Sequence, residues 1–283
     1  MFDLDPFRPA AADIEIPAVG IGTWHMGEDG SQRAREVEAL RHAMKLGFTH
    51  FDTAEMYADG GAEEVLGEAI ADSDRDTLFL VSKFYPWNAD PDAMLASCAA
   101  SLDRLGIEQL DLYLLHWPGD VPFEETLEGA RRLMDEGRIR AFGVSNFDED
   151  ALADLADRQL LDLVAANQVM HNIPHRAAEA GLFPFMAERE IAAIAYSPLE
   201  VGPMRQIDGL EDVAEEAGLT LAQLAIAWHV SLGLAAPIPK SANKAHLDDL
   251  AAAVRAAPLP PAMMQAITAT APLPDPGTPL PIR

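Results

Sequence analysis

Residues Phe48 to Tyr57 read Phe48-Thr49-His50-Phe51-Asp52-Thr53-Ala54-Glu55-Met56-Tyr57, which indicates the end of a buried strand and the loop after it. Asp52 closes the predicted strand, and Tyr57 follows on the loop. The next two apolar runs along the chain end in the same way, one at Lys83 and the other at His116. Because the carboxyl ends of parallel barrel strands meet on one face, these four side chains are expected to share one cavity.

The rest of the chain repeats this unit of strand and helix. Eight such alternations with short links predict a closed (β/α)8 barrel, a fold that typically occupies roughly 250 residues. An open doubly wound sheet is the alternative, but the turn Gly20–His25 lacks the third glycine of its usual Gly-x-Gly-x-x-Gly pattern. The predicted strands are 18–23, 50–52, 78–83, 110–116, 140–145, 165–169, 191–196 and 236–239, and the predicted helices are 31–46, 62–70, 90–105, 123–136, 148–158, 183–189, part of 210–232, and 243–256.

The domain organisation expected from this pattern is one barrel domain over residues 1–283. A short plug or hairpin at about 13–18 precedes the first strand. Proline is frequent over 258–283, which predicts an irregular strap over the barrel with one more helix inside it, at 262–271.

Composition narrows the cellular setting. No run of about 18 apolar residues is present, so a membrane span is not expected. Residues 1–17 lack the basic start and apolar centre of a secretory signal. Cys98 is the single cysteine, which argues against an internal disulfide or a cysteine metal cluster. A reducing cytoplasm and a site without metal are therefore expected.

The formal net charge of -26 excludes further classes of partner. A strongly acidic surface repels nucleic acid and anionic lipid, so neither is an expected partner. Regular apolar periodicity argues against disorder. The chain has lysine at positions 45, 83, 240 and 244 alone, whereas Asp and Glu total 46, which resembles the composition of proteins from salt-accumulating halophiles.

The four strand-end residues suit proton donation to a carbonyl oxygen. A phenol has an ordinary pKa of roughly 10, so a catalytic Tyr57 needs a nearby cation, which Lys83 supplies and which is expected to lower the Tyr57 pKa. Asp52 would keep Lys83 charged in an apolar interior. His116 would hold the substrate oxygen. Each residue taken alone also has a structural explanation, as a backbone acceptor or a packed ring.

In this order and spacing, the four residues resemble the catalytic tetrad of the aldo-keto reductase family. The resemblance extends from Gly20 to about Leu250 and implies reduction of a small-molecule aldehyde or ketone by NADPH in a monomeric enzyme. It implies a set of cofactor-binding residues: Gly22, Thr23, Trp24, Asp52, Ser145, Asn146, Gln168, Tyr196, Ser197, Leu199, Lys240, Ser241, Asn243, His246 and Asp249. In that family, the groups matching Ser145, Asn146 and Gln168 hold the nicotinamide carboxamide, and the ring matching Tyr196 stacks on nicotinamide.

Two departures affect cofactor choice. Lys240, Ser241 and Asn243 match the family's site for the 2′-phosphate of NADPH, with Lys244 nearby as a further cation. However, His246 stands where the family has arginine, and Asp249-Leu250 replaces a Glu-Asn pair. Histidine lacks the permanent charge and the two-pronged donor of arginine. NADPH is the expected cofactor, and use of NADH as well stays open.

Aromatic residues follow several of the predicted strands and are expected, together with Tyr57 and His116, to wall the substrate pocket: Trp24, Tyr85, Trp87 and Trp117. The loops after His116 and Tyr196 are short by the standard of the resembling family, which favours small carbonyl substrates. Asp52 and Glu55 do not form the opposed carboxylates of a glycosidase. His171 and His175 have a metal-like spacing that Pro174 interrupts.

Two other functions remain open from the sequence. One is a cofactor-binding redox sensor that keeps the tetrad but turns over slowly. The other is a barrel lyase or isomerase, because a fold does not fix a function. The second predicts no nucleotide binding and no role for Lys240.

Overall fold

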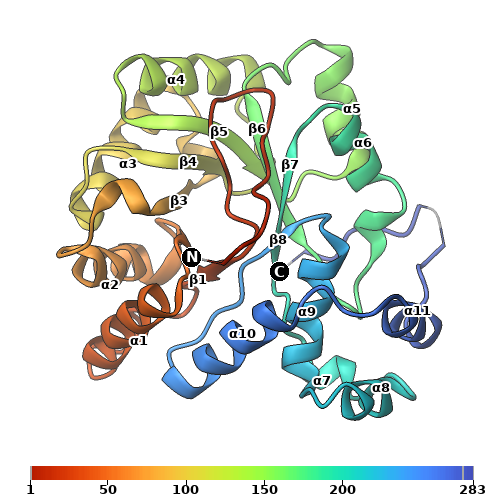
Figure 1. Ribbon diagram of the computed structural model, residues 1–283. Coiled ribbons are helices and arrows are strands. Elements are labelled where there is room, and N and C mark those ends of the chain that lie inside the picture. The colour runs from red at the N-terminus through yellow and green to blue at the C-terminus, as the bar shows by residue number, and fades with distance from the viewer. Residues whose placement is uncertain (1, 276, 283) are drawn as a thin grey trace.

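The computed structural model describes residues 2–275 and 277–282 and contains one eight-stranded sheet in which every strand runs parallel to the strand before it. Figure 1 shows the strands at the centre and helices around them. The bridge between Gly22 and Lys240, with the Gly22 amide donating to the Pro239 carbonyl at 3.0 Å, joins the first strand to the segment after the last. The strands are β1 (Gly20–Gly22), β2 (His50–Asp52), β3 (Phe79–Phe84), β4 (Leu110–Leu115), β5 (Ile139–Ser145), β6 (Val164–Met170), β7 (Ala192–Tyr196) and β8 (Ala236–Pro237). The predicted (β/α)8 fold is confirmed.

The helices begin and end close to their predicted positions. One helix, α7, was not predicted, because Gly202 and Pro203 give its four residues a low helix propensity. The α-helices are α1 (Arg33–Leu46), α2 (Gly61–Ile70), α3 (Pro91–Leu105), α4 (Phe123–Asp135), α5 (Glu149–Asp157), α6 (Leu182–Glu188), α7 (Val201–Met204), α8 (Leu210–Glu216), α9 (Leu221–Leu232), α10 (Lys244–Ala256) and α11 (Pro261–Thr270).

Local sequence sets several of these boundaries. Asp90, Asp148 and Thr220 each precede a helix and accept a hydrogen bond from a backbone amide of its first turn. Gly47 ends α1 with a φ of 108°, a left-handed conformation that glycine adopts without a Cβ clash, and its amide bonds the carbonyls of Ala43 and Met44. These caps fix where α1 ends and where α3, α5 and α9 begin.

The barrel interior is apolar at the end covered by the N-terminal segment and polar at the end where the strands finish. Val81, Leu112 and Ile194 belong to one buried cluster with Ile14 and Ile16 of the N-terminal segment. That segment is held by an antiparallel bridge between Phe7 and Ile16, and Figure 1 shows it crossing in front of the strands. Polar groups are therefore concentrated at the other end, where the strands finish.

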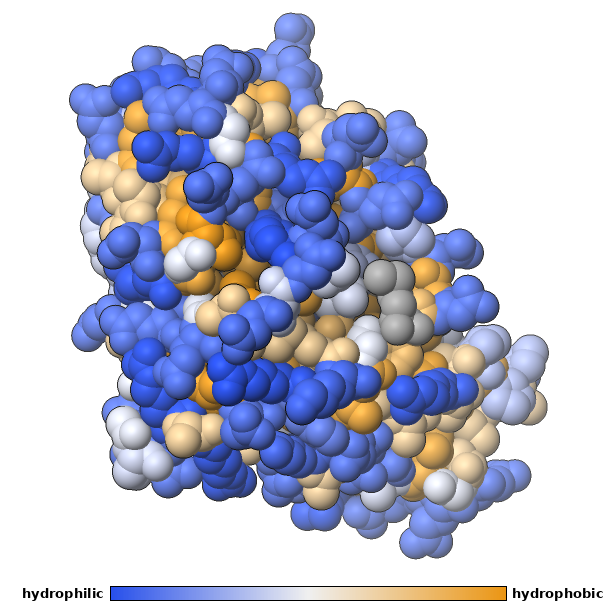
Figure 2. Space-filling model, turned by 60° about the vertical axis from the view of Figure 1, so that its left-hand side comes forward, coloured by the Kyte–Doolittle hydropathy of each residue, from blue (hydrophilic) through white to orange (hydrophobic). Residues whose placement is uncertain are grey.

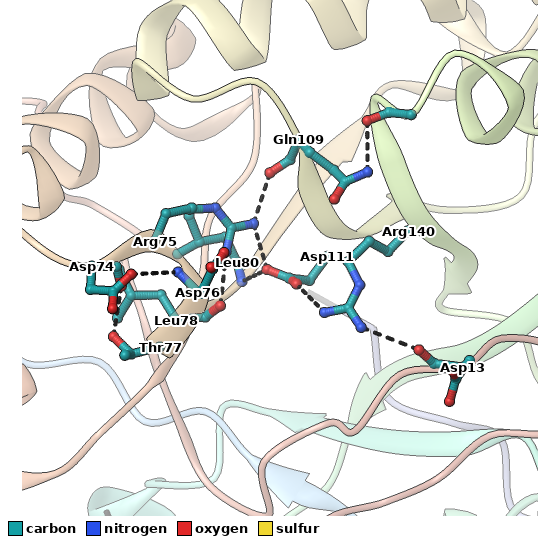
Figure 3. A network of polar contacts seen from close by, with 11 residues as sticks. Asp13, Asp74, Arg75, Asp76, Thr77, Leu78, Leu80, Gln109, Asp111 and Arg140 are labelled. Atoms are coloured by element: carbon teal, nitrogen blue, oxygen red, sulfur yellow. Dashed lines mark hydrogen bonds and ion pairs between the residues drawn. The ribbon is translucent and has the colours of Figure 1, made fainter.

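An ion-pair network joins three strands where β4 begins (Figure 3). The Asp111 carboxylate, 3% exposed, meets Arg75 at 2.6 Å and Arg140 at 2.9 Å, and it accepts the Leu80 amide at 2.8 Å. Arg140 also donates to the carbonyl of Asp13 at 3.2 Å. Since three donors share this one buried carboxylate, it ties β3, β4, β5 and the N-terminal segment together.

Hydrophilic residues cover most of the face drawn in Figure 2, and apolar residues show between them in smaller patches. Among residues 2–275 and 277–282, none of the helices has the length and apolar character needed to cross a membrane.

Candidate active site

Lys83 lies at the centre of the site and is fully buried. Its Nζ atom donates to Asp52 Oδ1 at 2.5 Å, to the Thr53 carbonyl at 2.9 Å and to the Tyr57 hydroxyl at 3.2 Å. Pairing between β2 and β3 continues past the end of β2, because the Glu55 amide donates to the Lys83 carbonyl at 3.1 Å. The loop that carries Tyr57 is thus held against the strand that carries Lys83, and the geometry brings three of the four predicted catalytic residues into direct contact.

His116 follows β4 and completes the group. Its backbone amide donates to the Phe84 carbonyl at 3.0 Å, and its ring packs edge-on against the Tyr57 ring, with centroids 5.8 Å apart. Burial, with the nearby Lys83 charge as a smaller cause, lowers the pKa of His116 to about 3. The imidazole is therefore neutral near pH 7 and can donate one N–H to an oxygen without carrying a charge.

The Tyr57 pKa differs from the sequence expectation. Burial raises the pKa of Tyr57 above its ordinary value, and the Lys83 charge, which acts in the opposite direction, does not overcome it. Lys83 lowers the Tyr57 pKa as expected, but the net Tyr57 pKa lies above its ordinary value, because desolvation of the phenolate is the larger effect. For Lys83, burial favours the neutral amine, but Asp52 and Tyr57 together raise its pKa. Tyr57 is thus a protonated donor beside a charged ammonium.

The tetrad opens into a cavity of about 290 Å³. Asp52, Tyr57 and His116 line it, whereas Lys83 lies behind them. Of the predicted cofactor residues, the cavity is lined by Gly22, Thr23, Trp24, Asp52, Ser145, Asn146, Gln168, Tyr196, Ser197, Leu199 and Lys240. Met56, Pro198, Ile238 and Pro239 also line it and were not singled out from the sequence.

The neutral polar groups form one hydrogen-bonded set on the wall of this cavity. Asn146, at a left-handed φ of 63°, donates to the His116 carbonyl at 3.0 Å and accepts the Tyr196 hydroxyl at 2.8 Å. Ser145 donates to the Gln168 carbonyl at 2.8 Å. These contacts fix the side chains that could hold a carboxamide.

Gln168 makes a contact that was not foreseen. Its Nε2 atom donates to Asp52 Oδ2 at 2.7 Å, while Lys83 occupies the other oxygen of the same carboxylate. Both Gln168 and Asp52 are 1% exposed. The candidate cofactor groups and the candidate proton-donating groups are therefore one continuous network.

A second cavity, of about 580 Å³, shares Leu199 and Lys240 with the first. Ser241, His246 and Asp249, three of the predicted cofactor residues, also line it. Asn243 lies at the start of α10 instead, where its side chain accepts the Ala245 amide at 3.0 Å. Two adjoining cavities, one with amide-binding groups and the other with lysine, hydroxyl and imidazole groups, fit an elongated dinucleotide.

Tyr85, Trp87 and Trp117 form one cluster of rings that meets His116. The rings of Tyr85 and Trp87 stack with centroids 4.2 Å apart, and the Trp117 ring lies 4.9 Å from that of His116. These three residues pack beside the first cavity and are not among those that line it, whereas Trp24 does line it. Their role in substrate binding stays a prediction.

The sequence suggested Glu55 only as a possible glycosidase carboxylate with Asp52, and the structure gives it a different, positioning role. One carboxylate oxygen accepts the Tyr85 amide at 2.7 Å and the Asn88 side chain at 3.0 Å, and the other accepts the Ser97 hydroxyl. It links the Tyr57 loop to the aromatic loop after β3. Its position two residues before Tyr57 was the available signal.

His171 and His175 meet different carboxylates, Glu179 at 2.9 Å and Glu200 at 3.2 Å, so they do not converge on one point.

Comparison with known proteins gives a consistent result. A family model described as "Aldo/keto reductase family" matches residues 18–271. The chain is 44% identical over 249 residues to methylglyoxal reductase YeaE of Escherichia coli, covering 86% of this chain and 87% of that protein. It is 34% identical to a glyoxal reductase of Bacillus subtilis, covering 81% of this chain and 79% of that protein. The NADPH complex of a Klebsiella pneumoniae aldo-keto reductase aligns with a TM-score of 0.90 and 40% identity over 99% of both chains.

Proposed function

This chain belongs to the aldo/keto reductase family, and from that premise we propose that Tyr57 protonates the oxygen of a small dicarbonyl substrate during its reduction. The protein is an NADP-dependent oxidoreductase that reduces aldehyde or ketone carbonyls. The observation that carries the role of Tyr57 is the contact of one buried ammonium, Lys83 Nζ, with both Asp52 and the Tyr57 hydroxyl.

The proton transfer follows from this contact. NADPH, when bound, supplies the hydride. Tyr57 and the neutral His116 donate hydrogen bonds to the carbonyl oxygen, which polarises the carbonyl carbon. The Tyr57 proton then passes to the oxygen as negative charge develops on it. The phenolate left behind is stabilised by Lys83 at 3.2 Å, and Asp52 keeps Lys83 in place.

The cofactor is assigned to the two adjoining cavities. We assign the nicotinamide to the cavity beside Tyr57, with its ring on Tyr196 and its carboxamide near Ser145, Asn146 and Gln168. The adenosine half is assigned to the second cavity, near Lys240 and Ser241, with Asn243 and Asp249 at its edge. The link from Gln168 to Asp52 supports this arrangement, because it makes the carboxamide-binding wall continuous with the tetrad.

The proposed substrates are small 2-oxoaldehydes such as methylglyoxal. Two relatives carry the names methylglyoxal reductase and glyoxal reductase. The first cavity, at about 290 Å³, must hold both the nicotinamide and the substrate, which favours small molecules. Trp24 is the proposed contact for the substrate's apolar side, and Tyr85, Trp87 and Trp117 are proposed contacts for larger substrates at the mouth.

The test is a titration of the protein with NADPH and NADH, followed by fluorescence, and then addition of methylglyoxal to the bound complex. Multiple turnovers of NADPH with methylglyoxal, and slower turnover with bulky aromatic ketones, are expected. Tight NADPH binding with less than one turnover in an hour would instead support a redox-sensing subunit. Failure to bind either nucleotide would contradict the cofactor assignment.

We also propose that this is a monomeric, single-domain enzyme and that it works in a salt-rich cytoplasm. The charge of -26 supports the salt-rich setting, because high salt screens the self-repulsion of so many carboxylates. Activity and unfolding temperature are expected to rise from dilute buffer into the molar range of KCl. Full activity and an unchanged unfolding temperature in dilute buffer would contradict the halophilic proposal, and light scattering tests the monomer.

A further inference from the structure

The second cavity is walled by two separate parts of the chain. Lys240 and Ser241, between β8 and α10, and His246 in α10 belong to the first part, and Arg205 and Glu211 line it from the segment that contains α7 and α8. The sequence predicted a nucleotide site from the first of these two parts alone. The segment with α7 and α8 brings an arginine into the same cavity.

The charge of this cavity does not suit a phosphate dianion without a second cation. Its lining includes three carboxylates, on Glu211, Glu215 and Asp249, and two permanently charged cations, on Lys240 and Arg205. Lys244, which the sequence offered as a further cation, pairs with Glu38 of α1 at 3.2 Å and does not line the cavity. Arg205 is therefore the one permanent positive charge that can assist Lys240 among the described lining residues.

Arg205 is held loosely where it is. Its Nε atom lies 3.6 Å from Glu211 Oε1, and the two side chains are 67% and 61% exposed. An exposed ion pair of this kind contributes little to stability, so breaking it costs little free energy. A guanidinium group can also donate two parallel hydrogen bonds to a phosphate, which is a stronger arrangement than a single loose contact.

We propose that Arg205 determines the preference for NADPH over NADH by leaving Glu211 and pairing, together with Lys240, with the 2′-phosphate in the second cavity. This inference rests on the proposed placement of the adenosine half in the second cavity. Arg205 would supply the permanent charge that His246 lacks. Glu211 would weaken the preference, because it competes with the phosphate for the same guanidinium group.

The experiment measures binding and does not depend on turnover. Dissociation constants for NADPH, NADH, 2′,5′-ADP and 5′-ADP are determined at one ionic strength for the wild type and for Arg205→Gln and Glu211→Gln. Arg8→Gln is the matched control, because Arg8 is 60% exposed and pairs with Glu15 in the N-terminal segment, away from the cavity. Circular dichroism confirms that each variant is folded.

Arg205→Gln is expected to weaken NADPH and 2′,5′-ADP binding about tenfold and to leave NADH and 5′-ADP within about twofold. Glu211→Gln is expected to tighten NADPH about two- to threefold, and Arg8→Gln to change neither ratio. Equal weakening of phosphorylated and unphosphorylated ligands, or no change in Arg205→Gln, would overturn the inference while leaving the proposed function intact. A wild type that binds no nucleotide would overturn both.

Discussion

Replacing Lys83 with methionine removes the ammonium that contacts Tyr57 and keeps a side chain of similar length. At the observed separation of 3.2 Å, a charge on Lys83 stabilises the Tyr57 phenolate by about 5 kcal/mol at an effective dielectric constant of about 20. Each factor of ten in rate corresponds to about 1.4 kcal/mol, so the reduction step is expected to slow by about 10³- to 10⁴-fold.

The assay is single-turnover oxidation of NADPH by methylglyoxal, followed by absorbance in a stopped-flow instrument. Lys83 lies behind the cavity lining, so NADPH is expected to bind Lys83→Met within about threefold of the wild-type affinity. Lys45→Met is the matched control, because it removes an exposed lysine of α1. A rate loss below tenfold, in a folded variant that binds NADPH normally, would refute the assignment of Lys83 as the group that stabilises the phenolate.

Three further results are expected from other parts of the network. Gln168→Leu removes a hydrogen bond to a buried carboxylate, so the free energy of unfolding should fall by about 2 kcal/mol in a urea titration. The dissociation constant for NADPH should rise, and an unchanged NADPH affinity would argue against a carboxamide contact. Asp111→Asn weakens the network in Figure 3 and should also lower the free energy of unfolding by about 2 kcal/mol, while the rate per folded molecule, measured with NADPH and methylglyoxal, stays at the wild-type value. Burial lowers the pKa of His50 from 6.5 to about 4, so the unfolded state binds a proton that the folded state does not, and stability is lost as pH falls through this window. Between pH 7 and pH 5 His50 should account for about 2 kcal/mol of that loss, and His50→Gln should show a correspondingly shallower pH dependence in urea titrations; an unchanged slope would show that His50 does not titrate this way.

The sequence was sufficient to predict the barrel and to predict that Asp52, Tyr57, Lys83 and His116 lie together, because both follow from a regular pattern along the chain. Each of the four proposed catalytic residues lies at or near the end of a strand or follows one closely, and parallel strands bring their ends together, so position along the chain predicts position in space. The alternation of apolar strand and helix segments between Asp52, Lys83 and His116 is regular enough to be recognised from the sequence alone.

Contacts between side chains far apart in the chain could not be predicted from the sequence. Gln168 and Asp52 are 116 residues apart, and only the closed barrel shows that their side chains meet at 2.7 Å. The presence of Arg205 and Lys240 in one cavity depends on the course of a loop that contains a short, weakly signalled helix. The Tyr57 pKa was misjudged for a related reason, because the degree of burial, which outweighs the Lys83 charge, is a property of the packed structure.

The raised Tyr57 pKa is compatible with its proposed role. A general acid must carry its proton when substrate binds, and burial ensures that it does. Lys83 then acts mainly after transfer, when the phenolate exists.

The most direct test of the account is a single-turnover experiment with Tyr57→Phe loaded with NADPH and mixed with methylglyoxal. This change removes one oxygen atom and keeps the ring that packs against His116. The account predicts NADPH binding within about threefold of the wild type and a loss of NADPH oxidation of about 10³-fold or more, as expected when a positioned general acid is removed. Oxidation of bound NADPH by Tyr57→Phe at a rate within tenfold of the wild type would contradict the central claim that Tyr57 is the proton donor.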